Sequence, residues 1–178
     1  MRFIETALPG AFVLELDPIQ DERGFFARSF CRDEFLRHGL NPDCVQCNIS
    51  FNRLCGSVRG MHYQAAPHAE AKLVRCTAGR IYDVIVDLRP DSPGYLRHVA
   101  VELDAENRRI LYVPEGFAHG FQTLTDNAEV FYQMAAAYVP DAARGVRYND
   151  PVFGIEWPLP VAAISPKDAA YPDFSPAG

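Results

Sequence analysis

The chain has 178 residues, of which 48% are hydrophobic and 22% charged, and its formal net charge is −6. These values fit one globular domain over residues 1–178 and exclude a disordered or collagen-like chain. We expect neither nucleic acid nor membrane as a partner, because the balance is acidic and no apolar run approaches membrane-spanning length. Glu5 and Glu15 interrupt the stretch where a signal peptide would need an apolar core, so we expect a cytoplasmic protein.

Short segments with period-two alternation predict β-strands along most of the chain. In chain order, the predicted strands are 12–16, 25–30, 45–51, 58–64, 72–76, 80–89, 98–103, 110–113 and 130–134. A helix is predicted only at 33–38, with weaker helical turns near 141–144 and 168–171. Many short strands and few short helices predict an all-β fold, an antiparallel sandwich or jelly roll. From about residue 148 the chain is rich in proline, which predicts an extended arm packed on the barrel.

The segment 45–51 shows the clearest alternation. Its odd positions carry Val45, Cys47, Ile49 and Phe51, whereas its even positions are all polar, at Gln46, Asn48 and Ser50. The polar face therefore either meets solvent or lines a wet cavity. We interpret the five cysteines as buried free thiols and expect neither a disulfide framework nor a thiolate zinc site.

The stretch 59–64 carries the strongest sign of chemistry. His62 has strand-forming neighbours, and imidazole titrates near neutral pH, so a histidine held in a cavity can take a proton from carbon without a cofactor. Arg59 is a candidate anchor for an anion. In a regular strand, however, Arg59 and His62 point to opposite faces. Either Gly60 marks a β-bulge, or Arg59 serves a neighbouring subunit's pocket.

A second motif lies at 114–119, where the spacing Pro-x-Gly-x-x-His is typical of cupin barrels. The first cupin motif would need a second histidine, but Gln64 stands at that position and Glu70 is displaced. The barrel is therefore predicted without the metal site. A metal-dependent isomerase or oxygenase that uses His62, His119 and Glu70 stays open as an alternative.

Together with the rest of the chain, these residues closely resemble the dTDP-4-dehydrorhamnose 3,5-epimerase family of sugar-nucleotide enzymes. The resemblance runs nearly end to end, and its landmarks are 21–26, 46–48, 59–64, 72–74, 83–89, 116–121, Tyr132, 149–151, 157–158 and 165–168. It implies a cupin-type jelly-roll barrel (a double-stranded β-helix), cofactor-free catalysis and a homodimer that exchanges an N-terminal strand.

The resemblance also implies roles for individual residues. His62 would be the general base, held by Asp168, with Lys72 near the developing enolate oxygen and Tyr132 as the general acid on the opposite face. Arg23 and Arg59 would grip the diphosphate of the substrate. The remaining substrate contacts would be Phe26, which stacks on the base, together with Arg28, Gln46, Asn48, His119, Tyr138 and Lys167.

The implied substrate is a nucleotide-linked 4-keto-6-deoxyhexose, most simply dTDP-4-dehydro-6-deoxy-D-glucose. Inversion at both carbon 3 and carbon 5 would give dTDP-4-dehydro-L-rhamnose. Two positions depart from the family pattern, because Arg28 and Ala143 stand where the family commonly has glutamate. The nucleotide, the sugar, the pathway and the carbon inverted therefore stay open. The alternatives are a mono-epimerase or a binding protein for a different sugar nucleotide.

Overall fold

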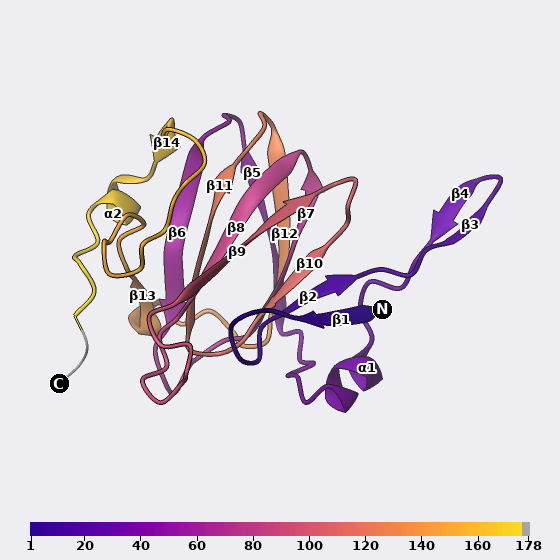
Figure 1. The fold of residues 1–178 in the computed structure, drawn as a ribbon, viewed down its shortest axis with the longest axis horizontal. Coiled ribbons are helices and arrows are strands. Elements are labelled where there is room, and N and C mark those ends of the chain that lie inside the picture. Colours follow the sequence, from indigo (N-terminus) through magenta and orange to yellow (C-terminus); the bar gives the residue numbers. More distant parts are fainter. Residues whose placement is uncertain (176–178) are drawn as a thin grey trace.

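A computed structural model describes residues 1–175, which form two facing β-sheets with mainly antiparallel pairing (Figure 1). In spatial order, the first sheet contains β1 (Arg2–Glu5), β2 (Phe12–Glu15), β10 (Ile110–Val113), β7 (Lys72–Ala78), β12 (Ala128–Met134) and β5 (Gln46–Asn52). The second contains β13 (Ala143–Gly145), β6 (Ser57–Gln64), β11 (Phe117–Thr123), β8 (Arg80–Asp87) and β9 (His98–Asp104), and β14 (Ala163–Ile164) pairs with β6 in parallel.

The all-β prediction is confirmed, since helical structure within residues 1–175 is limited to α1 (Arg32–Arg37), α2 (Pro166–Ala169) and one 3-10 turn (Pro140–Ala142). All three match predicted helical segments to within a few residues. The predicted strand 25–30 is wrong beyond Phe26, where irregular chain leads to α1. None of the helices in this part of the chain is long and apolar enough to cross a membrane.

Three apolar clusters hold these layers together. Between the sheets, Val74 and Leu111 of the first sheet belong to the same buried cluster as Ile85 of the second. Beneath α1, the ring of Phe35 packs edge-on against Tyr112 at 5.8 Å between centroids. Burial of a residue of this size contributes about 2–3 kcal/mol, which anchors the single turn and a half of α1.

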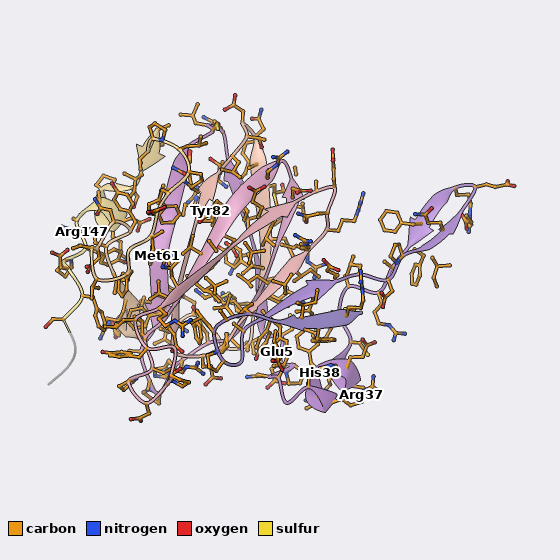
Figure 2. The ribbon with its side chains drawn as sticks, in the orientation of Figure 1. Glu5, Arg37, His38, Met61, Tyr82 and Arg147 are labelled. Carbon is orange, nitrogen blue, oxygen red and sulfur yellow. The ribbon has the colours of Figure 1, made fainter. Side chains whose placement is uncertain are left out.

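The chain after β13 covers the outer face of the second sheet. Val146 and Phe153 are buried there against Met61 of β6, which is fully buried. Figure 2 shows Met61 and Tyr82 on this side of the sandwich, with Arg147 farther out on the covering segment. The ring of Tyr82 lies edge-on to Trp157 at 6.3 Å. This segment brings α2 back to β6, and β6 carries His62.

A two-stranded hairpin extends away from the sandwich. It consists of β3 (Ile19–Asp21) and β4 (Gly24–Phe26), and its two strands project away from the two sheets (Figure 1). Ile19 and Phe26 are 70% and 72% exposed. Near the base of the hairpin, Phe25 lies under the guanidinium of Arg108 at 4.6 Å. Large apolar side chains held away from the core indicate a surface that another molecule covers.

Candidate active site

A β-bulge in β6 resolves the position of Arg59 relative to His62. His62 pairs with His119 and Arg59 with Phe121, so two residues of β6, 60 and 61, lie opposite one residue of β11, Gly120. The bulge restores both side chains to one side of the strand, and both line the same depression. The bulge predicted as the first alternative is therefore confirmed.

Glycine is required at the bulge for two reasons. Gly60 has φ +114°, a conformation that side-chain-bearing residues rarely adopt. A Cβ at Gly60 would also lie 2.6 Å from the Cα of Gly120 and 2.7 Å from the carbonyl oxygen of His119. The sequence Arg-Gly-Met-His is thus the local cause of the geometry that places a cation and an imidazole together.

His62 and Asp168 form a directly bonded pair. The Nε2 of His62 lies 2.7 Å from Oδ1 of Asp168, and Oδ2 of Asp168 accepts a 3.2 Å hydrogen bond from the backbone N–H of Gly60. Asp168 is delivered by α2, whose N-cap Ser165 accepts a bond from the Asp168 N–H at 3.0 Å. Proline at the first helical position presets this turn.

The charges in this pair are set by the surroundings of the carboxyl. Burial acts to raise the pKa of Asp168, but the hydrogen bond and charge of His62 and the N–H of Gly60 outweigh it, so the pKa lies below its ordinary value. Because the carboxylate oxygen Oδ1 can only accept a hydrogen bond, Nε2 of His62 carries the proton. In that tautomer, Nδ1 of His62 carries the free lone pair.

Two adjoining depressions meet at His62. The first, of about 410 Å³, is lined by six predicted site residues, namely Gln46, Asn48, His62, Tyr132, Tyr138 and Lys167. The second, of about 680 Å³, has Arg53, Arg59 and Lys167 among apolar and small polar residues. His62 and Lys167 border both. The site therefore offers a polar, aromatic chamber next to a cationic groove.

The polar wall of the chamber consists of residues from strands β5, β6 and β12 and from the loop that carries Tyr138. The even positions of β5 face inward, so Gln46 and Asn48 line the chamber. The Oε1 of Gln46 accepts a 2.9 Å bond from the backbone N–H of Tyr138. Burial raises the pKa of Tyr132, Arg59 acts against this rise, and Glu70 adds to it.

Lys72 stands behind the chamber wall. Its Nζ lies 3.0 Å from Oε1 of Glu70 and donates a 3.4 Å bond to the carbonyl oxygen of His62. Glu70 lines the chamber, whereas Lys72 borders a separate small cavity near Phe35. Lys72 thus contributes its charge from behind His62 and Glu70.

Each side chain proposed as a ligand in the metal-dependent alternative is bonded to another residue. His62 bonds Asp168, His119 bonds Oδ1 of Asp83 at 2.8 Å, and Glu70 pairs with Lys72. Within residues 1–175, histidine, cysteine and acidic side chains form no group of three that could hold a metal ion.

Comparisons with known proteins identify the family of this chain. The family model described as dTDP-4-dehydrorhamnose 3,5-epimerase matches residues 5–176. The chain belongs to this family. The dTDP-4-dehydrorhamnose 3,5-epimerase of Salmonella typhimurium is 42% identical over 174 residues, which cover 97% of this chain and 94% of that protein.

Two solved structures extend the similarity to the fold. The dTDP-4-dehydrorhamnose 3,5-epimerase of Elizabethkingia anophelis superposes with a TM-score of 0.95 at 40% identity and covers 98% of this chain and 96% of its own. A dTDP-6-deoxy-D-glucose-3,5-epimerase from Legionella pneumophila, solved with dTDP-4-keto-L-rhamnose, has a TM-score of 0.89 at 38% identity, with coverages of 96% and 90%. The predicted jelly-roll class is confirmed by this likeness.

Four residues that the epimerase family pattern assigns to substrate lie outside both depressions. Arg23 and Phe26 are on the projecting hairpin, where Arg23 pairs with Asp21. Arg28 follows the hairpin and pairs with Oε1 of Glu34 at 3.2 Å. In a single chain, Arg28 therefore lies outside the pocket. His119 is 7% exposed and bonds Oδ1 of Asp83 at 2.8 Å.

Sequence reasoning missed two residues of the epimerase site. Tyr171 follows α2 and lies edge-on to His62 at 6.1 Å between ring centroids, and Gly145 leaves room for its ring. Arg144 lines the chamber next to Ala143. Arg144 belongs to β13, which pairs Gly145 with His62, and Tyr171 packs against Gly145, so only knowledge of the tertiary pairing could have revealed them.

The interpretation of the cysteines as buried is wrong for four of the five. Only Cys76 is buried, while Cys31 and Cys55 are half-buried and Cys44 and Cys47 exposed. Cys44 and Cys47 also have Cys-X-X-Cys spacing, and their Sγ atoms lie 3.5 Å apart. All five are free thiols, as predicted.

Proposed function

We propose that this chain is an epimerase of a nucleotide-linked 4-keto-6-deoxyhexose, most simply dTDP-4-dehydro-6-deoxy-D-glucose. The observation that carries the proposal is the His62–Asp168 pair at the junction of a polar chamber and a cationic groove. Such a junction suits a sugar whose reacting carbons face the imidazole while its diphosphate lies among arginine and lysine. Family membership supports the same substrate class.

The reaction needs a base next to an acidified carbon. Carbons 3 and 5 flank the ketone at carbon 4, so removal of either proton gives an enolate. Nδ1 of His62 takes the proton, and the carboxylate of Asp168 holds the ring and stabilises the imidazolium that forms. Lys72 supports the base by donating to the carbonyl oxygen of His62, while its ion pair with Glu70 offsets its charge.

Inversion requires a proton from the other face of the sugar. Tyr132 lines the chamber across from His62, on a strand of the opposite sheet. Because burial raises its pKa, the phenol keeps its proton at neutral pH and can donate it to the enolate carbon. Two groups on two faces are sufficient to change configuration, and the sequence of events needs no cofactor.

Substrate binding divides between the two depressions. Arg59 and Lys167 hold the diphosphate in the groove, where forked guanidinium donors match phosphate oxygens. Gln46, Asn48 and Tyr138 contact the sugar in the chamber.

The assembly we propose is a homodimer in which the hairpin of one subunit completes the partner's site. This arrangement accounts for the exposed Phe26 and for the separation of Arg23 and Arg28 from their own pocket. Arg23 would then join the diphosphate site, and Phe26 would stack on the base. Each chain acts as a single domain, residues 1–178, because the arm after residue 148 supplies Asp168 to the barrel. A diphosphate-linked substrate does not cross a bilayer unaided, so we place the enzyme in the cytoplasm.

The test is turnover of dTDP-4-dehydro-6-deoxy-D-glucose by the purified chain, followed by NMR of the sugar. We expect an epimerised 4-keto product whose rate is unchanged by a chelator. Loss of activity with chelator and recovery with a divalent metal would instead support the metal-dependent alternative. Tight binding without any product would identify a sugar-nucleotide-binding protein.

A further inference from the structure

We propose that Cys44 and Cys47 are a thiol–disulfide modification site, and that closing the disulfide shifts Gln46 in the chamber wall and weakens substrate binding. The first half of this inference is independent of the catalytic assignment. The second half rests on the proposed function, because it concerns the affinity of that site for its substrate.

The two sulfur atoms are already close to bonding distance. Sγ of Cys44 lies 3.5 Å from Sγ of Cys47, and both residues are exposed. A disulfide requires about 2.0 Å between the sulfurs, so the remaining gap is about 1.5 Å. Cys44 lies in irregular chain before β5, where rotation about χ1 and a small backbone adjustment can close it.

A cation, Arg75, lies near the pair, and the acid next to Cys44 in the chain, Asp43, is paired with Arg32. Sγ of Cys44 accepts a 3.5 Å bond from Nε2 of Gln133, and Oε1 of Gln133 accepts a 3.1 Å bond from Arg75. Within residues 1–175, Arg75 has no carboxylate partner, and its Nε is buried without a hydrogen-bond acceptor. Burial raises the pKa of Cys47, as does Cys44, while the charge of Arg75 acts in the opposite direction. The net result is a raised pKa, so Cys47 reacts through a minor population of thiolate.

The chemistry is ordinary thiol–disulfide exchange with a small disulfide as oxidant. The thiolate of Cys44 attacks one sulfur of the oxidant, which forms a mixed disulfide and releases one thiolate. The thiolate of Cys47 then attacks Sγ of Cys44 and expels the second thiolate. The protein loses two protons and two electrons, and the oxidant gains the electrons as it becomes two thiols.

Gln46 connects this pair to the site, because it lies between the two cysteines in the chain. Its backbone joins the segment that the disulfide would shorten, and its side chain faces the chamber and bonds the N–H of Tyr138 at 2.9 Å. Drawing Cys44 toward Cys47 therefore moves an amide that sets the position of Tyr138. Neither cysteine lines the chamber, so the modification acts through Gln46.

Mass spectrometry of the native protein treated with glutathione disulfide tests the first half. We expect loss of two hydrogen masses and a peptide cross-linked between Cys44 and Cys47, both reversed by a reductant. Cys44→Ser should prevent the loss, whereas Cys55→Ser, a control at another solvent-accessible thiol, should not. An unchanged mass, or a stable glutathione adduct on Cys44 with no cross-link, would overturn the proposal.

Kinetics of the cross-linked protein test the second half. We expect KM for the sugar nucleotide to rise at least about threefold while kcat changes by less than about twofold, since the base and acid are untouched. Cys47→Ser should keep the KM of the wild-type protein without the disulfide, both before and after treatment with the oxidant. An unchanged KM in fully cross-linked protein that still turns over would refute the coupling to Gln46 and leave the epimerase assignment intact.

Discussion

Asp168 is the residue on which the chemistry of His62 depends. It is only 5% exposed, yet its carboxyl has a lowered pKa because the contacts with His62 and Gly60 outweigh the effect of burial. A permanently charged carboxylate fixes which nitrogen of His62 carries the proton. Nδ1 is then the nitrogen that is free to act as a base.

Asp168→Asn should therefore lower kcat by about 10²–10⁴-fold, because the amide cannot stabilise an imidazolium and no longer enforces the tautomer. KM should change little. Steady-state kinetics on the 4-keto sugar nucleotide measure both constants. Asp173→Asn is the matched control, since Asp173 also pairs with a cation, Arg147, but at the surface. Equal effects of the two substitutions would contradict the assignment.

The same carboxyl should make stability depend on pH. A lowered folded-state pKa means that Asp168 stabilises the fold fully above its unfolded pKa of about 3.9, and that this contribution disappears as pH falls through the folded value. The difference in unfolding free energy between wild type and Asp168→Asn should thus be constant near neutrality and shrink below about pH 4. Urea unfolding at several pH values measures it. A difference that grows on acidification would have the wrong sign for this account.

At the scale of single elements, the bulge in β6 does most to shape the site. It turns a strand that would place Arg59 and His62 on opposite faces into one that presents them together. It depends on two glycines, because Gly60 and Gly120 approach too closely for a Cβ on either residue.

Gly60→Ala should destabilise the fold by about 2–4 kcal/mol, since it adds a steric clash to a positive φ. Gly39→Ala is the matched control, because Gly39 has φ +69° but nothing within 4 Å of its would-be Cβ. That variant should lose only about 1 kcal/mol. Chemical denaturation compares the two, and equal losses would mean that the close packing against Gly120 is unimportant.

The sequence predicted strands correctly where the local pattern of apolar residues is strong. It failed where pairing with a distant strand determines the structure. Segment 110–113 is a strand at its predicted bounds, because its four apolar residues form a buried central strand. β11 was missed because Gly120 and the preceding turn conceal a strand that is buried throughout. Period two in 45–51 separated two faces correctly but could not say which is inward. The polar face is inward, and Ile49 and Phe51 are 65% and 50% exposed.

The candidate site was predictable only in part for a similar reason. The motif around His62 identified a base from residue type and context. The partner Asp168 is 106 positions away and came from the family resemblance, because no local pattern connects it to β6. Tyr171 was missed, because it reaches His62 only after the arm folds back over the second sheet.

At the scale of the whole molecule, the hairpin is the feature that a single chain leaves unexplained. It carries Arg23 and Phe26 away from the sandwich and exposes them. In the proposed dimer, these side chains complete the partner's site.

Mixing two inactive variants tests this exchange. His62→Asn removes the base, and Arg23→Ala removes an arm contact to the diphosphate. In an exchanged dimer, the intact His62 of one subunit meets the intact arm of the other, so an equal mixture should recover about one quarter of wild-type activity. Activity assays after subunit exchange measure the recovery. No recovery in demonstrated mixed dimers would show that each arm serves its own chain.

Exchange of solvent deuterium into the sugar tests the central claim most directly. Incubation of dTDP-4-dehydro-6-deoxy-D-glucose with the wild-type protein in heavy water should introduce label beside the ketone, at carbon 3, carbon 5 or both, as read by NMR. His62→Asn should abolish labelling, and Tyr132→Phe should retain it while impairing inversion. Labelling and turnover at the wild-type rate in His62→Asn would contradict the account.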